Sequence, residues 1–127
     1  MKKILIVEDE YDIGEIVEMT LSAKYEVLVK NDSRELTAIL RQFKPDAILL
    51  DNYIGNKNAQ EIIAEIKSEG FDLAIPIILF SAHEEIKSIA RDIGAIDFIA
   101  KPFDLEDLHR CMSRVFLSIQ NKERTEK

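Results

Sequence analysis

Short apolar runs alternate with segments of helical periodicity along the chain. The apolar runs cover residues 4–7, 27–29, 47–50, 77–80 and 96–99. Between them, apolar residues recur at the i, i+3, i+4 and i+7 spacing in segments 13–21, 36–43, 59–66 and 86–93, and a broader apolar stripe runs from Leu105 to Ile119. This spacing places one apolar stripe on a helix face. The pattern therefore predicts five strands that alternate with five helices.

Residues that favour helix ends agree with this alternation. Ser33, Asn58 and Asp104 stand where helix N-caps are expected. Gly70 and Gly94 stand just past the ends of two predicted helices, where a left-handed residue is common.

Strands that alternate with helices form a parallel sheet with helices on both faces. The third and fourth runs are continuously apolar, which is typical of central strands, whereas Glu26 and Asp97 mark the second and fifth runs as edges. With right-handed crossovers, these features favour an α/β fold with a five-stranded parallel sheet of order 2-1-3-4-5, the flavodoxin-like arrangement. We assign residues 1–120 to one domain and residues 121–127 to a short polar C-terminal tail.

Polar residues of compatible chemistry follow four of the predicted strands. Glu8 and Asp9 follow the first strand, Asp51 the third, Ser81 the fourth and Lys101 the fifth. The carboxyl ends of parallel strands meet at one edge of the sheet, where ligands bind. Each residue alone has an ordinary explanation as a turn, capping or surface residue. Together they predict one site with three carboxylates, a hydroxyl and an ammonium group.

The predicted site favours metal-assisted phosphoryl chemistry. Carboxylates held close together repel each other unless a cation lies among them. An all-oxygen ligand set without His or Cys selects a hard ion, Mg²⁺ before Ca²⁺. A carboxylate can also be the nucleophile that receives a phosphoryl group. Mg²⁺ and Lys101 would then neutralise charge, and the Ser81 hydroxyl would donate a hydrogen bond to a phosphoryl oxygen.

The composition argues against several other classes of function. The 127 residues are 46% hydrophobic and 32% charged, which is typical of a globular domain. A net charge of −7 argues against direct nucleic-acid binding, which needs clustered Lys and Arg. The apolar stretch near the N-terminus is too short for a signal peptide or a membrane span. Because Cys111 is the only cysteine, no intrachain disulfide is possible, and we expect a cytoplasmic protein without membrane association.

Four segments in a fixed order and spacing carry a family signature. They are ILIVEDE at 4–10, PDAILLD at 45–51, PIILFSA at 76–82 and GAIDFIAKPF at 94–103. On these segments the chain resembles the receiver domains of two-component response regulators, the single-domain chemotaxis regulators among them. The resemblance covers the chain from Lys3 to about Phe116. It implies a phosphoprotein of signal transduction, or of a phosphorelay, that carries an aspartyl phosphate.

The resemblance also implies a role for each residue of the site. Asp51 would be the phosphoacceptor and a metal ligand, and Asp9 would bind Mg²⁺ directly. Glu8 would act mainly through a metal-bound water. The backbone carbonyl of Tyr53 would be a further metal ligand. Lys101 would pair with Asp51 and then with the phosphoryl group.

A switch is implied by the same resemblance. The Lys101–Pro102 bond would be cis. Ser81 would shift toward the phosphoryl group, and Phe98 would turn inward into the space that this opens. The shift would change the face formed by the predicted helix 86–93, the strand 96–99 and the last helix.

The segment after the phosphoacceptor departs from the family pattern. The family commonly has Pro at the fourth position and Gly at the eighth, where this chain has Gly55 and Ala59. We therefore expect residues 54–58 to be looser and the metal loop to be less preorganised. Tyr53 and His83 stand where the family tunes the lifetime of the phosphoryl group, and their bulk would shield it from water.

We expect a response regulator that takes a phosphoryl group from a histidine kinase or phosphotransfer protein and then binds a downstream protein partner. It would not be an enzyme acting on a separate substrate, because it would catalyse only its own phosphorylation and dephosphorylation. The chain would be a stand-alone regulator or the receiver of a longer DNA-binding response regulator, and a monomer or weak homodimer. Cys111 stands where many DNA-binding relatives have an Arg that makes a dimer salt bridge, which disfavours that dimer.

Two functions from other classes fit the sequence less well. A flavodoxin-like carrier needs a Ser-, Thr- or Gly-rich loop after the first strand to bind the flavin phosphate, but residues 8–10 are all acidic. A small Mg²⁺-dependent phosphatase with an aspartyl nucleophile would need a second acid two residues after Asp51, where this chain has Tyr53.

Overall fold

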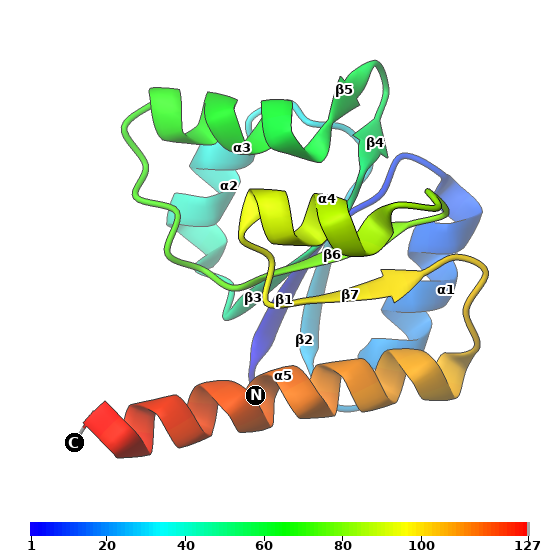
Figure 1. Ribbon diagram of the computed structural model, residues 1–127, viewed down its shortest axis with the longest axis vertical. Coiled ribbons are helices and arrows are strands. Elements are labelled where there is room, and N and C mark those ends of the chain that lie inside the picture. The colour runs from blue at the N-terminus through cyan, green and yellow to red at the C-terminus, as the bar shows by residue number, and fades with distance from the viewer. Residues whose placement is uncertain (127) are drawn as a thin grey trace.

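A five-stranded parallel sheet forms the centre of the molecule (Figure 1). The computed structural model describes residues 1–126 of the chain and the side chains of residues 1–122. The strands of the sheet are β1 (Lys3–Val7), β2 (Glu26–Lys30), β3 (Ala47–Asp51), β6 (Ile77–Ser81) and β7 (Asp97–Ala100). They lie in the order β2-β1-β3-β6-β7 and all pair in parallel. The predicted order 2-1-3-4-5 and the two predicted edge strands are confirmed.

Helices cover both faces of this sheet. They are α1 (Tyr11–Leu21), α2 (Leu36–Phe43), α3 (Ala59–Ser68), α4 (Ile86–Ile93) and α5 (Leu105–Glu126). One apolar cluster joins the sheet to α2, α3 and α4, and a second joins it to α1 and α5. Successive residues of a strand point to opposite faces, so Leu5 and Val7 enter the first cluster while Ile4 and Ile6 enter the second.

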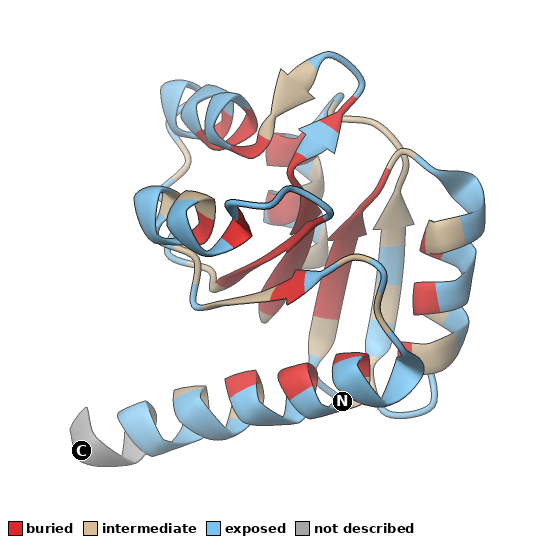
Figure 2. Cartoon of the chain, turned by 45° about the vertical axis from the view of Figure 1, so that its right-hand side comes forward, coloured by how far each residue is buried: buried red, intermediate tan, exposed pale blue. Residues whose placement is uncertain are grey.

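The buried residues concentrate in the central strands and on the inner helix faces (Figure 2). All five residues of β3 and all five of β6 are buried. Complete burial of a Leu or Ile side chain stabilises the fold by about 1.5–3 kcal/mol. The two central strands are therefore a rigid base for the residues at their carboxyl ends.

Most of the predicted helix ends are confirmed. The Asn58 side chain accepts a hydrogen bond from the Glu61 N–H, and the Glu61 side chain accepts one from the Asn58 N–H, so α3 begins with a capping box. Asp104 accepts a hydrogen bond of 2.8 Å from the backbone of the first turn of α5. Gly70 and Gly94 have φ values of 84° and 73°, the left-handed conformation expected after a helix.

Two local predictions are wrong. Ser33 does not cap α2, because the helix begins at Leu36 and the residue before it has a left-handed backbone and no side-chain cap. Helix α5 continues past the predicted end near Ile119 and extends beyond the sheet (Figure 1). The segment expected to be looser lies in a short antiparallel hairpin of β4 (Tyr53–Ile54) and β5 (Lys57–Asn58), and its looseness stays a prediction. Lys127, the last residue of the predicted tail, lies outside the described residues, and the domain boundary at 120 stays a prediction.

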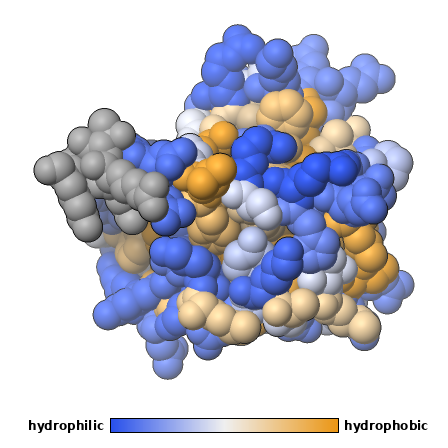
Figure 3. Space-filling view, turned by 90° about the horizontal axis from the view of Figure 1, so that it is seen from below, coloured by the Kyte–Doolittle hydropathy of each residue, from blue (hydrophilic) through white to orange (hydrophobic). Residues whose placement is uncertain are grey.

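The surface beside α5 mixes hydrophilic side chains with smaller hydrophobic patches (Figure 3). Leu105 and Leu117 are large apolar residues of this helix with side chains open to solvent. Of the helices in the described part of the chain, none has both the length and the apolar composition needed to cross a membrane.

Candidate functional site

The predicted site residues meet at the carboxyl edge of the sheet. Asp51 is the last residue of β3 and Ser81 the last residue of β6, while Glu8 and Lys101 directly follow β1 and β7. The parallel register brings these ends level, since Asp51 pairs with Phe80 across β3 and β6. The convergence expected from the strand order is therefore present in the structure.

Lys101 forms the centre of the site. Its Nζ donates a hydrogen bond of 2.7 Å to Glu8 Oε1 and one of 2.9 Å to Asp51 Oδ2. The side chain of Glu8 is 0% exposed, that of Asp51 10% and that of Lys101 14%. The ammonium group also lies 4.5 Å from the centre of the Phe80 ring. Little water can screen these charges, so each interaction is stronger than on the surface.

Burial raises the pKa of Glu8 from 4.5 to about 7. The hydrogen bond with Asp51 and the negative charge of that carboxylate contribute to this rise in pKa, and the hydrogen bond from Lys101 offsets only part of it. Burial alone would lower the pKa of Lys101, but its hydrogen bonds with the two carboxylates outweigh that effect and leave its pKa raised. The lysine is therefore charged, while the pair of carboxylates has more negative charge than one ammonium group neutralises.

A cluster of three carboxylates can hold a metal ion at this edge. One oxygen from each of Glu8, Asp9 and Asp51 lies within 4.8 Å of the other two. Asp9 Oδ2 also accepts a hydrogen bond of 2.9 Å from the Gly55 N–H, and Asp51 Oδ1 accepts one of 3.4 Å from the Tyr53 N–H. These bonds orient the carboxylates, and the all-oxygen set fits a hard divalent cation such as Mg²⁺.

Ser81 lies in the buried part of the site and starts a short chain of hydrogen bonds. Its Oγ accepts a bond of 3.0 Å from the His83 N–H, and His83 Nδ1 accepts one of 3.0 Å from the Glu85 N–H at the start of α4. The Ser81 hydroxyl keeps its proton for another acceptor. Phe98 of β7 is half-buried against the apolar cluster beneath α4. The predicted cis bond between Lys101 and Pro102 is present.

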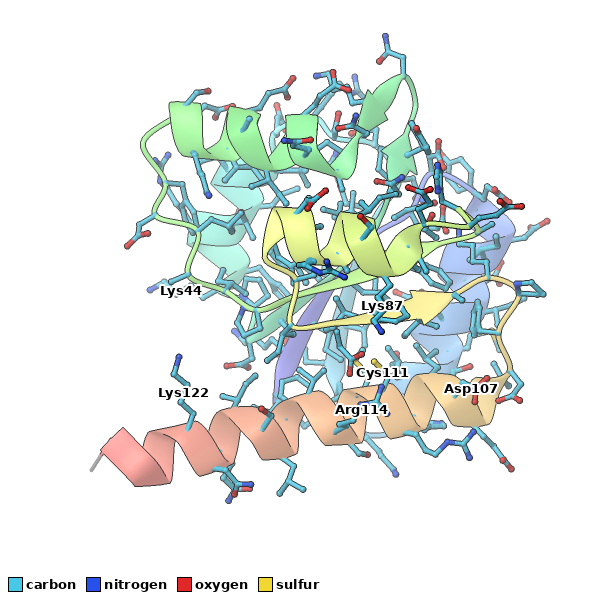
Figure 4. All side chains as sticks on the ribbon, viewed as in Figure 1. Lys44, Lys87, Asp107, Cys111, Arg114 and Lys122 are labelled. Atoms are coloured by element: carbon cyan, nitrogen blue, oxygen red, sulfur yellow. The ribbon has the colours of Figure 1, made fainter. Side chains whose placement is uncertain are left out.

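The face between β7 and α5 carries its own ion pair. Arg114 Nε lies 2.8 Å from Asp97 Oδ2, which joins the helix to the edge strand. The side chains of Cys111 and Arg114, both on α5, lie on the side of the helix that faces β7 (Figure 4). Cys111 is buried in the core, and burial together with the charge of Asp97 raises its pKa to about 12. A thiol with so high a pKa is a packing residue rather than a nucleophile.

Sequence reasoning missed three residues that contribute to this edge. The Asn31 side chain donates a hydrogen bond of 2.9 Å to the Glu8 carbonyl, although it follows the edge strand β2. Gly55 orients Asp9 through its backbone N–H. Asn52 is buried directly after Asp51. A polar residue after a strand normally indicates a turn, so the sequence did not single out Asn52, and a backbone donor such as Gly55 leaves no signal in the sequence.

The fold and the site together define a doubly wound α/β domain with a cluster of carboxylates paired with a lysine at its carboxyl edge. The family model of the response regulator receiver domain matches residues 4–113, and the chain belongs to this family. Its place in two-component signal transduction and its flavodoxin-like fold, both predicted from the sequence, are thereby confirmed.

Relatives of known sequence are longer regulators. The phosphate regulon transcriptional regulatory protein PhoB of Pseudomonas aeruginosa is 36% identical over 110 residues, covering 84% of this chain and 48% of PhoB. The transcriptional regulatory protein KdpE of Staphylococcus aureus is 34% identical over 124 residues, covering 93% of this chain and 52% of KdpE. The chain thus spans about half the length of the curated relatives it matches.

Solved structures give the same fold. The chemotaxis protein CheY4 of Vibrio cholerae aligns with a TM-score of 0.78 and 29% identity, over 91% of this chain and 98% of CheY4. NtrX of Brucella abortus aligns with a TM-score of 0.86 and 27% identity, over 99% of this chain and 29% of NtrX. The chain is therefore similar both to a receiver that accounts for nearly a whole chain and to one that is part of a much longer protein.

Proposed function

We propose that this chain accepts a phosphoryl group on Asp51 from a histidine kinase or phosphotransfer protein in a Mg²⁺-dependent reaction. The observation that supports this most strongly is the position of Lys101 Nζ, within hydrogen-bond distance of both Glu8 and Asp51 at the carboxyl edge of the sheet. The receiver family supplies the reaction class. The chain would work in the cytoplasm and would catalyse no reaction beyond its own phosphorylation and dephosphorylation.

In the proposed reaction an Asp51 carboxylate oxygen attacks the phosphorus of a phosphohistidine. The new P–O bond forms as the P–N bond breaks, and the imidazole nitrogen keeps the electron pair. Lys101 stabilises the negative charge on the oxygens, and the Ser81 hydroxyl donates to one of them. Mg²⁺ held by Glu8, Asp9, Asp51 and the Tyr53 carbonyl would supply further charge neutralisation. The protein then contributes mainly positioning.

The hydrogen bonds of Ser81 offer a route from the site to a binding face. If Ser81 turns toward a phosphoryl oxygen, its bond from the His83 N–H must change, and this bond is the first link to α4. Phe98 on the neighbouring strand then moves into the vacated space. The altered α4–β7–α5 face would bind a downstream protein partner. A monomer or weak homodimer is sufficient for this switch.

A test of the acceptor uses a small acyl-phosphate donor with and without Mg²⁺. We expect phosphoryl incorporation into the wild-type chain only with Mg²⁺, and none into Asp51→Asn. Asp46→Asn is the control, because Asp46 pairs with the backbone of Lys3 at the opposite end of the sheet. Incorporation that persists undiminished in Asp51→Asn would overturn the assignment of the acceptor.

The lengths of the relatives favour a second form of the same function. Because PhoB and KdpE are about twice as long as the matched region, this receiver can work as part of a DNA-binding response regulator. The alternative of a flavin carrier receives no support, since the loop after β1 places two carboxylates in the site, where they would repel a flavin phosphate. The alternative of a phosphatase receives none either, because Tyr53 stands where a second acid would be needed.

A further inference from the structure

A groove of about 120 Å³ is lined in part by Asn52 and Tyr53, the two residues that follow Asp51. Its walls come from the β4–β5 hairpin, the start of α3 and helix α4 (Figure 1). The lining includes Asn52, Tyr53, Asn58, Ile89, Asp92 and Ile93. Of the residues that line this groove, only Tyr53 has a part in the reaction proposed above, through its backbone carbonyl.

Asn52 is the unusual residue of the groove. It is 3% exposed, its backbone N–H donates to the Phe80 carbonyl and its carbonyl accepts from the Ala59 N–H. Its side-chain amide makes no hydrogen bond with any described residue. Burial of an amide without a partner is unfavourable, and an apolar side chain of the same size would pack there at lower cost. The amide is therefore free to pair with a group from outside the chain, and the groove is the opening through which such a group can reach it.

The other lining residues define the chemistry of that partner. Asp92 on α4 is exposed and negative, and no described residue that lines the groove is cationic. Tyr53 is 54% exposed, so its ring is open to stacking. Ile89 and Ile93 add an apolar wall on the α4 side. A guanidinium group is planar, donates to amide and carboxylate oxygens at once and stacks on aromatic rings, while its aliphatic stem prefers an apolar wall.

We propose that this groove binds an arginine side chain presented by a protein partner. The amide oxygen of Asn52 and the carboxylate of Asp92 accept hydrogen bonds from the guanidinium group. A lysine cannot donate in the same planar fork, so it binds more weakly. Free arginine is also disfavoured, because its α-carboxylate finds no cation among the residues that line the groove. The proposal goes beyond phosphoryl transfer and does not require it.

The probe for this site is N-acetyl-arginine amide, in which both backbone charges are absent. It is titrated into the ¹⁵N-labelled chain, and the amide signals of Asn52, Tyr53 and Asp92 are followed by NMR. We expect saturable shifts in these signals. The corresponding lysine amide and free arginine should produce clearly smaller shifts at equal concentration. Asp51→Asn should bind the probe like the wild type, which separates a failure of this proposal from a failure of the phosphoacceptor assignment.

Two variants test the recognising groups. Asn52→Leu and Asp92→Asn should each weaken binding about tenfold, the loss expected when a charge-assisted hydrogen bond is removed. Asp72→Asn makes the same charge change in the loop before β6, away from the groove, and should bind like the wild type. Asn52→Leu should melt at the same temperature as the wild type or higher, because it removes an unpaired buried amide.

Equal binding of the arginine and lysine probes, or wild-type affinity in Asp92→Asn, would overturn the proposal. A lower melting temperature for Asn52→Leu would also contradict it, since the amide would then have a structural partner within the fold. Because Asp92 is exposed, its substitution tests the groove even if the Asn52 variant fails to fold.

Discussion

Two clusters of carboxylates and cations lie at the same edge of the sheet and differ in burial and in their balance of charge. After β2, Asp32 lies 3.0 Å from Lys30 Nζ and 3.0 Å from an Arg34 nitrogen, with 39% of its own side chain and 82% of the Arg34 side chain exposed. After β1, Glu8 pairs with Lys101 at 2.7 Å and is 0% exposed. The hydrogen bonds from Arg34 lower the pKa of Asp32, whereas burial raises that of Glu8 to about 7.

The comparison shows that residue types alone do not make a reactive site. Both clusters follow a strand and both contain the same kinds of charge. Water screens the exposed cluster, so its ion pairs contribute little beyond the solubility of the surface. In the buried cluster the desolvated carboxylates have more negative charge than Lys101 neutralises, and this excess favours a metal ion or a proton. The buried cluster is therefore ready for chemistry, and the exposed one is not.

The largest expected effect comes from removing the cation of the buried cluster. Lys101→Met keeps the aliphatic stem but leaves two buried carboxylates without a counter-charge. We expect the free energy of unfolding without Mg²⁺ to fall by about 3 kcal/mol at pH 8. Urea unfolding measures this change, and the loss should shrink toward pH 5, where Glu8 is protonated.

Arg34→Met is the matched change in the exposed cluster and should leave the urea midpoint unchanged. Equal effects of the two substitutions would show that burial does not distinguish the clusters.

A smaller effect concerns the pH dependence of stability. Because the pKa of Glu8 is about 7 in the folded chain and 4.5 ordinarily, the folded state binds this proton more tightly than the unfolded state. Protonation of Glu8 therefore stabilises the folded state fully below pH 4.5, and this contribution to the free energy of unfolding is lost as the pH rises through about 7. At 1.4 kcal/mol per pKa unit, the total is at most roughly 3 kcal/mol.

Glu8→Gln should remove the loss of stability between pH 4.5 and 7. Urea unfolding at several pH values without Mg²⁺ would show this. Asp32 has a lowered pKa, so its contribution has the opposite sign: it is present above the ordinary pKa of an Asp and lost on acidification. Asp32→Asn should therefore leave the loss between pH 4.5 and 7 intact, and a flattened profile in this variant instead of Glu8→Gln would contradict the account.

The smallest expected effect concerns the lifetime of the phosphoryl group. Tyr53 is two residues after Asp51 and 54% exposed, so its ring can cover the acyl phosphate without being part of the core. Tyr53→Ala should speed autodephosphorylation several-fold while leaving stability unchanged. Tyr11→Ala, at a tyrosine that is 73% exposed on α1, is the control. An unchanged rate in Tyr53→Ala would remove Tyr53 from this role.

The sheet order and the site were predictable because both follow from general rules. Continuous apolar runs mark the central strands, and parallel strands bring Glu8, Asp51 and Lys101 to one edge wherever the exact strand ends fall. The cis bond at Lys101 was predictable from the family resemblance alone. These predictions depend on topology and on residue type, both of which can be read from a sequence.

The remaining features depend on contacts that a sequence does not record. The β4–β5 hairpin has only two residues in each strand, too few for an alternating pattern. Ser33 has the right chemistry for a cap, but the left-handed backbone of Glu35 makes α2 start later. The role of Asn52 follows from its burial without a partner, and a polar residue after a strand normally indicates a turn.

The most direct test of the central claim is to locate the phosphoryl group on the chain. The wild-type chain is phosphorylated by an acyl-phosphate donor with Mg²⁺, reduced with borohydride and digested, and the peptides are sequenced by mass spectrometry. Reduction converts an aspartyl phosphate to homoserine, so the account predicts homoserine at position 51 and an unmodified residue at Asp32. Homoserine at another position, or a phosphoryl group on His83, would contradict it.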